Sequence, residues 1–539
     1  MRVRDECGEL FADAEFAGAF SGLGRSAWSP GRLAMVTALQ HVENLTDRAA
    51  AERVRVDLAW KYCLGLELED PGFNHTLLTD FRARLVAHGL EERALDLLLA
   101  GLRDKGLVKE RGRQRTDSTH VVAAVRRLNR LELCAESVRA ALEALAAAAP
   151  HWVEAVLAGE GWQRRYGRPF DESWRPPSSQ AKRDQLAADV GCDAVELLQA
   201  AYHRDSPYWL RELPALQVLR QVVVQNYLIT TDTKGRQVVK RREAEQHGLP
   251  PGRLRLTSPY DTDARTGGKH GMQWTGYKLH ITETCDAPTE PAGKRPERPN
   301  LIVNVATTDA SVADAAMTGP LHQQLRERGL LPGEHFQDSG YASAALVHHV
   351  HADFGVVLVT PLTAPTSRQA RAGQGFDQAA FTIDWGARQA RCPQGQASHI
   401  WSPTTRRGQP VIRVRFPTTA CGPCPVREQC TTATRTGRQL NLQPRELHEL
   451  AHTNRTAQQD KNWQANYATR AGIEGTIHQT VHITGARRTR YRGLDKTHLD
   501  HVYDAVALDL IRLDAWWNDK PLDRQRTTHL ARCNLDLTT

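Results

Sequence analysis

The sequence predicts an α/β protein in which a mixed β-sheet is flanked by helices, with a helical region before it and large insertions within it. From residue 273 to residue 360, segments with strand-like alternation or short apolar runs take turns with helical segments. The first 110 residues instead place their apolar side chains at helical spacing. A chain of 539 residues is long enough for two or more domains, or for one domain with large insertions.

The N-terminal region carries several helix start signals. Ser29 and Pro30 supply an N-cap and a proline at the first helical position. Asp47 is a candidate cap for a second helix, and Asn74 or Thr76 for a third. Apolar residues at helical spacing follow these signals, among them Leu33, Val36, Leu39, Val42, Val54, Leu58, Leu78, Phe81 and Leu85. We therefore predict a small helical domain over residues 1–110.

The rest of the chain, residues 111–539, is predicted to form the sheet domain. The predicted strands are 113–125, 273–283, 300–307, 334–338 and 355–360. The predicted helices are 311–328, 341–352, 457–480 and 496–517.

Two segments break this pattern and are predicted to be insertions. The segment at about 128–258 is mostly helical and ends in a polar linker at 232–257. The segment at about 362–450 is rich in Arg, Thr, Gln, Pro and Cys and shows no sustained period.

The composition narrows the classes of function. The formal charge is +8 with a pI near 9.0, and most basic side chains are arginines. A polyanionic partner suits the arginine fork, although a merely basic soluble protein explains this charge equally well. We expect no export signal and no membrane anchor, because acidic residues interrupt both the N-terminus and the Ala-rich segment 140–159. Ten cysteines, six of them scattered singly, indicate a reducing cytosol rather than a disulfide framework.

Three acidic residues have settings suited to metal-ion chemistry. Asp117 interrupts a predicted strand in RTDST, Asp338 ends one in QDSGY, and Glu474 lies in a predicted helix. Tyr467, Arg470 and Glu474 share one face of that helix at i, i+3 and i+7. Carboxylates on neighbouring strands, faced by a third from a helix, offer hard oxygen ligands for two Mg²⁺ or Mn²⁺ ions. Two such metal ions held side by side support in-line phosphoryl transfer.

Each acid also has an ordinary structural explanation. Asp117 suits an Asx turn, Asp338 suits a helix N-cap, and Glu474 suits a surface ion pair with Arg470. The occurrence of all three in their distinct settings favours a shared site. Asp309, which follows a strand in TTDAS, is predicted to be a cap instead.

The motifs around these acids resemble the DDE transposases of bacterial insertion sequences. The resemblance rests first on RTDSTHV at 115–121, QDSGYAS at 337–343, YATRAGIEGT at 467–476 and GARRTRYRG at 485–493. It extends to WSPGRL at 28–33, SPYDTDAR at 258–265 and TGYKLHITETCD at 275–286. The Tyr-x2-Arg-x3-Glu element is the most specific of these motifs.

This resemblance implies an RNase H-like catalytic domain in which Asp117, Asp338 and Glu474 bind the catalytic Mg²⁺ or Mn²⁺. It implies that Tyr467 and Arg470 contact DNA near the cleaved phosphate. The partners would be the transposon terminal inverted repeats, target DNA and a second copy of the chain in a homodimeric synaptic complex. The N-terminal helical domain would bind the transposon ends, and the protein would work in the bacterial cytoplasm at the nucleoid.

One position departs from the family pattern. The family's signature often continues to a Lys or Arg seven residues after the Glu, where this chain has Val481. The basic segment that follows is predicted to supply the phosphate contacts instead, through Arg487, Arg488, Arg490 and Arg492.

Four cysteines lie close together in the second insertion. Cys392, Cys421, Cys424 and Cys430 have the form C-x28-C-x2-C-x5-C, with two knuckle-like turns. Four thiolates in such turns suit a structural Zn²⁺, although the irregular spacing equally fits reduced, partly buried thiols.

The leading interpretation is a transposase that cleaves at its ends and transfers the 3′ ends to target DNA. A nuclease of the same fold without strand transfer, or an inactive transposase-derived DNA-binding regulator, remain alternatives.

Overall fold

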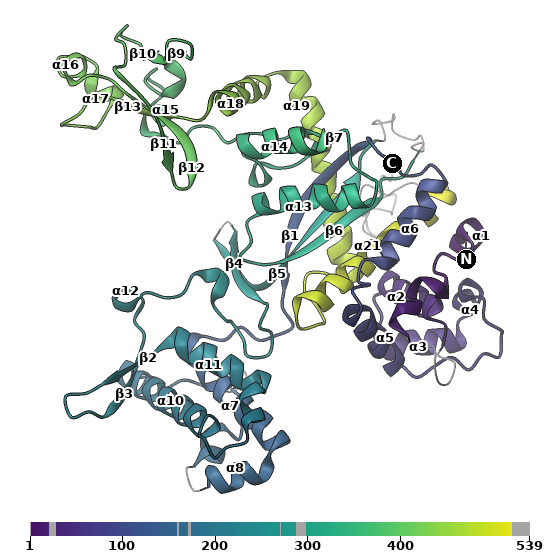
Figure 1. Cartoon of the computed structure of the whole chain (residues 1–539). Helices are drawn as coiled ribbons and strands as arrows, with labels where there is room; N and C mark the ends of the chain where they lie inside the picture. Colours follow the sequence, from purple (N-terminus) through teal and green to yellow (C-terminus); the bar gives the residue numbers. More distant parts are fainter. Residues whose placement is uncertain are drawn as a thin grey trace, which may run out of the picture.

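The computed structural model describes residues 2–20, 28–158, 161–170, 174–269, 271–286 and 298–519. A mixed β-sheet lies at its centre (Figure 1). Its strands are β1 (Arg113–Val122), β4 (Arg265–Lys269), β5 (Met272–Thr284), β6 (Ile302–Asp309), β7 (Glu334–Phe336) and β8 (Val357–Val359). The order is β6-β5-β1-β7-β8, and β4 pairs with the first residues of β5. The predicted α/β class with a mixed sheet is confirmed.

The strand senses divide the sheet into two halves. β5 is antiparallel to both β1 and β6, although the first insertion separates β1 from β5 in the sequence. β7 and β8 run parallel to β1, and helices cross between these parallel strands. The parallel register pairs Arg113 with Glu334 and Arg115 with Phe336.

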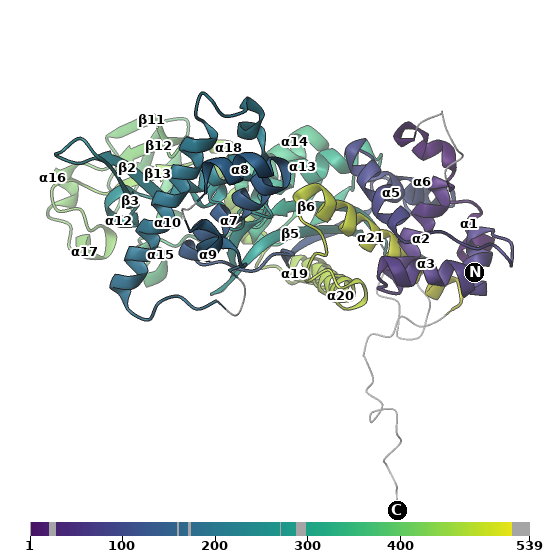
Figure 2. The ribbon, with the colours of Figure 1, turned by 90° about the horizontal axis from the view of Figure 1, so that it is seen from below.

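Helices cover both faces of the sheet (Figure 2). On one face lie α13 (Asp314–Glu327) and α14 (Ala344–Phe354). On the other lie α19 (Lys461–Tyr467), α20 (Gly472–Gln479) and α21 (Leu494–Trp517). The sequence indicates one helix over 457–480, but α18 (Arg445–Ala457), α19, a 3-10 turn at Ala468–Ala471 and α20 share this stretch. Asp460 explains the first break, because its carboxylate caps α19 by accepting from Asn462 N and Trp463 N.

The N-terminal helices pack against this domain. They are α1 (Arg2–Cys7), α2 (Pro30–Val42), α3 (Asp47–Val56), α4 (Leu58–Leu64), α5 (Thr76–Ala87) and α6 (Arg93–Asp104), with a 3-10 helix at Asp13–Ala19. Ser29 caps α2 as predicted, by accepting from Arg32 N at 3.1 Å, whereas Thr46 rather than Asp47 caps α3. Buried residues of these helices and of the sheet form one continuous hydrophobic cluster.

The first insertion has its own hydrophobic cluster. It contains α7 (Arg130–Ala148), α8 (Pro150–Val156), α9 (Trp162–Tyr166), α10 (Gln180–Ala201), a 3-10 helix at Tyr208–Glu212 and α11 (Pro214–Asn226). The predicted linker is partly ordered, because β2 (Tyr227–Thr231) and β3 (Gln237–Arg241) form a hairpin. Two short helices follow, α12 (Ala244–His247) and a 3-10 turn at Gly252–Leu254.

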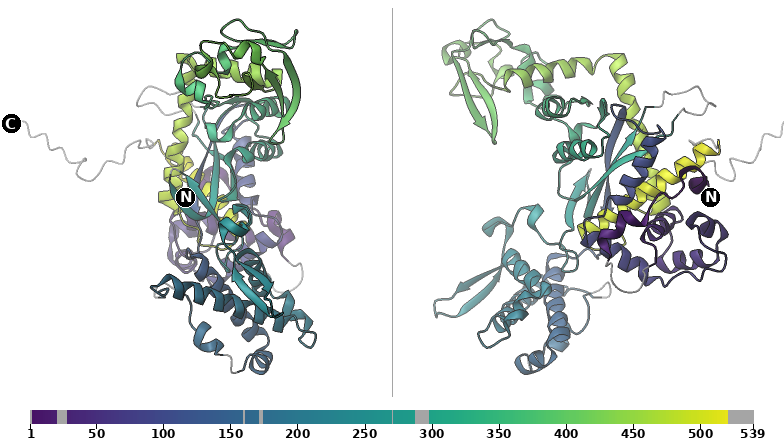
Figure 3. Two further views of the ribbon diagram at one scale, coloured as in Figure 1. Left: turned by 90° about the vertical axis from the view of Figure 1, so that its left-hand side faces the viewer. Right: turned by 45° about the vertical axis from the view of Figure 1, so that its right-hand side comes forward.

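The cysteine-containing insertion forms a separate lobe (Figures 1 and 3). A three-stranded sheet of β11 (Ile400–Arg406), β12 (Gln409–Arg415) and β13 (Gln439–Leu442) is its largest element. Around it lie α15 (Arg368–Ala372), a 3-10 turn at Gln378–Ala380, β9 (Thr382–Asp384), β10 (Gln389–Arg391), α16 (Thr418–Cys421) and α17 (Arg427–Cys430). The division of the chain into domains stays a prediction. In the part of the chain just described, no helix is both long and apolar enough to cross a bilayer.

Candidate active site

Asp117 lies in the middle of β1, the strand that joins the two halves of the sheet. Its carboxylate accepts from Ser118 N at 2.7 Å through Oδ1 and from Arg470 Nη1 at 3.0 Å through Oδ2. The first bond reaches only the next residue within a regular strand, so it is not the Asx turn that was the alternative explanation, and the second bond reaches Arg470, far along the chain. Burial raises the pKa of Asp117, and the negative charge of Asp338 raises it further.

Asp338 lies two residues beyond the end of β7, the parallel neighbour of β1. Continuing the register of Arg115 with Phe336 by two residues places Asp338 level with Asp117. Adjacent strands are about 4.8 Å apart, so the two acids lie side by side at the edge of the sheet where β7 ends. Asp338 also caps the 3-10 turn Ser339–Tyr341, because its Oδ1 accepts from Gly340 N at 2.8 Å.

Glu474 is on the exposed side of α20, next to the same edge. Its Oε1 accepts from Arg470 Nη2 at 3.1 Å, while the other arm of that guanidinium holds Asp117. One arginine therefore bridges the strand carboxylate and the helix carboxylate. Glu474 does form the ion pair with Arg470 that was its ordinary structural explanation. That ion pair is part of a three-residue contact that includes Asp117.

The carboxylates offer the donor chemistry of a divalent-cation site. Carboxylate oxygens are the ligands that Mg²⁺ and Mn²⁺ prefer. The repulsion that raises the pKa of Asp117 is also of the kind that a bound cation relieves. As the side chains stand, with Arg470 between Asp117 and Glu474, no three Asp, Glu, His or Cys side chains in the described ranges are grouped to hold a metal ion.

Tyr467 lies one turn before Arg470 and faces the same region. Its ring stacks on Trp463, with centroids 5.0 Å apart and planes at 16°. Both rings pack against a small cluster that includes Phe336 at the end of β7. Burial raises the pKa of Tyr467, and its phenol is a hydrogen-bond donor at neutral pH as an ordinary tyrosine is.

The four arginines that follow α20 in the sequence have different partners. Arg487 Nη1 donates to Thr119 Oγ1 at 2.9 Å and to the His120 carbonyl at 2.8 Å, so it braces β1. Arg492 lies over the Tyr260 ring, 5.3 Å from its centroid. Arg488 is exposed.

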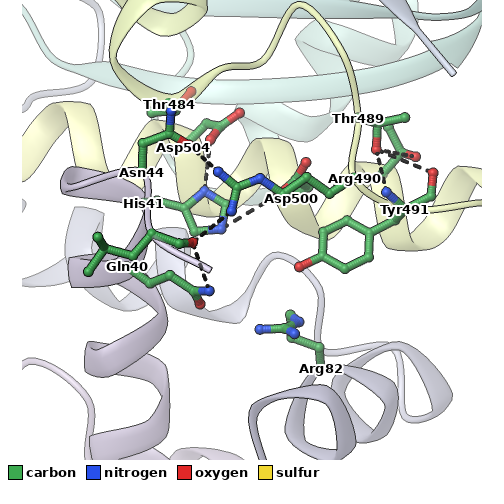
Figure 4. Close-up of polar contacts among 12 residues, drawn as sticks. Gln40, His41, Asn44, Arg82, Thr484, Thr489, Arg490, Tyr491, Asp500 and Asp504 are labelled. Atoms are coloured by element: carbon green, nitrogen blue, oxygen red, sulfur yellow. Dashed lines mark hydrogen bonds and ion pairs between the residues drawn. The ribbon is translucent and has the colours of Figure 1, made fainter. Parts of the chain in front are cut away.

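Arg490 connects the same loop to the N-terminal helices (Figure 4). It donates to the Leu45 carbonyl at 2.7 Å and to the Asn44 side chain. Beside it, the imidazole of His41 on α2 lies between Asp504, at 2.8 Å, and Asp500, at 3.6 Å, both on α21. The helices at the N-terminus and the basic loop are thus held together by polar contacts.

The departure at Val481 falls in a π-helical turn, Thr480–Thr484. Val481 is half-buried there. The exposed rings of His478 and His482 lie together, with centroids 4.0 Å apart, one and two turns beyond Glu474. The spacing of Glu474, His478 and His482 at intervals of four is visible in the sequence and indicates one shared helix face.

A buried polar network under α20 was also missed. Glu283 on β5 is fully buried and contacts Arg115, Thr476 and Arg512. A glutamate within the strand-like run 273–283 was a signal, because a buried carboxylate needs partners. Those partners come from remote segments, so only the tertiary structure names them.

The four cysteines line one cavity of about 30 Å³ in the second insertion. The backbone N–H of Arg438 donates to Cys421 Sγ at 3.4 Å. Burial raises the pKa of the Cys430 thiol; Arg438 lowers it, and the other three cysteines raise it. The sequence prediction that these cysteines gather at one place is thereby supported, while their metal stays a prediction.

Comparison with known families places two transposase segments on the chain. A family described as Transposase domain (DUF772) matches residues 4–84, and one described as Transposase DDE domain matches residues 391–514. The second range contains Glu474, whereas Asp117 and Asp338 lie between the two ranges. No curated protein and no solved structure matches the chain.

The α/β fold and these two matches define the class of protein, a transposase with a DDE domain. Both matches support a DDE-type transposase of insertion-sequence type, so the resemblance found in the motifs of the chain is confirmed. DNA is the substrate that this family implies.

Proposed function

We propose that this transposase binds the terminal inverted repeats of an insertion sequence, cleaves at its ends and transfers the 3′ ends to target DNA. Asp117, Asp338 and Glu474 are the proposed catalytic triad. The observation that carries the proposal is the meeting of three remote segments at one sheet edge: Arg470 bridges Asp117 and Glu474, and the strand register brings Asp338 level with Asp117. The strand order, with three antiparallel strands followed by two parallel ones, supports an RNase H-like fold.

The three carboxylates would hold the Mg²⁺ or Mn²⁺ ions, which when bound activate the attacking oxygen and stabilise the leaving oxygen. Arg470 has two carboxylate partners and a flexible stem, so its guanidinium can turn from them to a DNA phosphate. The hydroxyl of Tyr467 would donate a hydrogen bond to the same DNA strand. Because Arg487 and Arg490 are engaged within the chain, Arg488 and Arg492 are the better-placed phosphate contacts of the basic loop.

The N-terminal helices are the proposed end-binding part, and two copies of the chain would hold the two ends as a homodimer. In a bacterial cell the protein would act in the cytoplasm at the nucleoid, where its DNA lies.

The test is a variant of the acid that makes no ion pair within the described chain. Asp338→Ala should bind end DNA with unchanged affinity and lose Mg²⁺-dependent cleavage. Asp309→Ala is the matched control, because Asp309 is the last residue of β6 and its carboxylate accepts from the nearby Ser311, from N at 2.7 Å and from Oγ at 2.5 Å. Full cleavage by Asp338→Ala would remove this acid from the site.

A second assay separates the proposed reaction from its alternatives. A pre-cleaved end with a free 3′-hydroxyl is incubated with plasmid target, Mg²⁺ and the wild-type protein, and joined products are counted. Joining supports the transposase reaction. Cleavage without joining would indicate a nuclease, and end binding without either reaction would indicate a DNA-binding regulator.

We also propose that Cys392, Cys421, Cys424 and Cys430 bind a structural Zn²⁺. Their lobe is small: its hydrophobic cluster contains only Phe381, Ala390, Val414, Phe416, Leu440 and Leu442 as buried members. A core of this size needs a further constraint, which a four-thiolate zinc site provides. Because no three of these thiols are grouped closely enough as they stand, zinc binding would draw them together.

A further inference from the structure

We propose that Glu283 is a positioning residue that fixes α20, and with it Glu474, on the catalytic sheet. The inference rests on the proposed function, because it gives a role to the helix that carries the third acid. Glu283 lies on β5 directly opposite Arg115 of β1, and its side chain has no exposed surface.

Both oxygens of Glu283 are occupied by partners from other segments. Oε1 accepts from Arg115 Nε at 2.7 Å and pairs with Nη2 at 2.6 Å. Oε2 accepts from Arg512 Nη1 of α21 at 2.8 Å and from Thr476 Oγ1 of α20 at 2.6 Å. One buried carboxylate therefore ties β5 to β1, α20 and α21 at once.

The two arginines form further hydrogen bonds along α20. Arg115 Nη1 donates to the Thr469 carbonyl at 2.7 Å, just before the helix starts. Arg512 Nη2 donates to Thr476 Oγ1 at 2.6 Å and to Gln479 Oε1 at 3.0 Å, at the helix end. The helix is held at its start, middle and end from the buried side, while Glu474 faces outward.

These polar contacts are important because α20 has little else to hold it. Within the helix only Ile473 and Thr476 are buried. Apolar packing alone would let so short a helix slide or turn, since it is non-directional. Charge-assisted hydrogen bonds in a buried setting are directional and strong, and they define where the next residues of the helix lie.

The placement of Glu474 follows from this anchor. Thr476 and Glu474 are two residues apart, so they lie on different sides of one helical turn. Holding the Thr476 hydroxyl against Glu283 therefore sets the rotation that turns Glu474 toward Asp117. The network acts through the helix, because Glu283 contacts Arg115, Thr476 and Arg512 rather than the three acids.

The experiment compares two buried threonines of the same face. Thr476→Val removes the hydroxyl that contacts Glu283, and Thr476→Ser keeps it. Thr480→Val is the matched control, because Thr480 is equally buried but its hydroxyl donates only to the Thr476 carbonyl, at 2.8 Å. Amide hydrogen exchange over residues 472–479 of the protein alone, and end cleavage with Mg²⁺, are measured for all three.

We expect exchange in α20 to rise about tenfold in Thr476→Val, with β1 and β5 unchanged, because two charge-assisted bonds are lost, one donated to Glu283 and one accepted from Arg512. End cleavage should fall, end binding should stay, and Thr476→Ser should restore both exchange and cleavage. Thr480→Val should match the wild type. Equal α20 exchange in Thr476→Val and Thr480→Val would overturn the proposal.

Glu283→Gln gives an independent arm. It keeps the size of the side chain but removes the charge that two arginines share, so α20 exchange should rise further than in Thr476→Val. Slow α20 exchange in this variant would also overturn the proposal. If the wild type cleaves no end DNA, the proposed function fails, yet the exchange results still decide whether Glu283 holds the helix.

Discussion

The contact between Gly472 and Arg115 allows a sharp test of how α20 is held. A Cβ added at Gly472 would lie 1.9 Å from Arg115 Nη1 and 2.3 Å from its Cζ. The backbone of Gly472 has ordinary helical geometry, with φ −62°, so alanine is acceptable locally. The cost of Gly472→Ala therefore comes from moving Arg115, which is buried and held by Glu283 and the Thr469 carbonyl.

Two opposing effects determine the sign. Replacing glycine by alanine in a helix gains up to about 1 kcal/mol. Breaking a buried ion pair costs roughly 3–5 kcal/mol, and the lower end applies because Glu283 keeps Arg512. We expect a net loss of about 2 kcal/mol, or a fall of roughly 4–8 °C in unfolding temperature for a unit of 150–250 residues.

The assay is thermal unfolding followed by circular dichroism, with Gly475→Ala as the control. Gly475 is on the same helix, and a Cβ there would meet nothing within 4 Å. The control should unfold at the wild-type temperature or slightly above it. If Gly472→Ala is as stable as Gly475→Ala, Arg115 is free to move and the reasoning is wrong.

The remaining predictions concern the zinc lobe and the core helix α21. Purified protein should contain about one zinc per chain, and Cys424→Ser should lose it. Cys192→Ser, which changes an exposed cysteine of the helical insertion, should keep the zinc. A zinc-free wild type prepared without chelator would defeat this proposal. Burial raises the pKa of Asp509 to about 8, above the value of about 4 in an unfolded chain, so stability should fall as the pH rises between these values. Asp509→Asn can still accept a hydrogen bond from Ile302 N, so its unfolding temperature should fall less between pH 5 and pH 8 than that of the wild type. An unchanged pH dependence would show that Asp509 is ionised throughout this range.

Local signals accounted for most of the predicted elements. Alternation and apolar runs located β1, β5, β6, β7 and β8 to within a few residues, because these strands contain enough residues of one pattern or end at clear breaks. The helix expected over 457–480 was wrong as one element, since the cap at Asp460 and the 3-10 turn before Gly472 divide it. The hairpin of β2 and β3 was missed because β2 follows α11 without a break and the two valines of β3 stand among charged residues.

The sequence by itself determined the class of this protein and the identity of its candidate acids. Asp117, Asp338 and Glu474 lie in short motifs, and a short motif can be recognised from the order of the residues alone. Only the tertiary structure decided that Arg470 joins two of these acids and that Glu283 supports their helix from beneath. These contacts join residues hundreds of positions apart, and no local preference specifies which remote charge will be buried beside which.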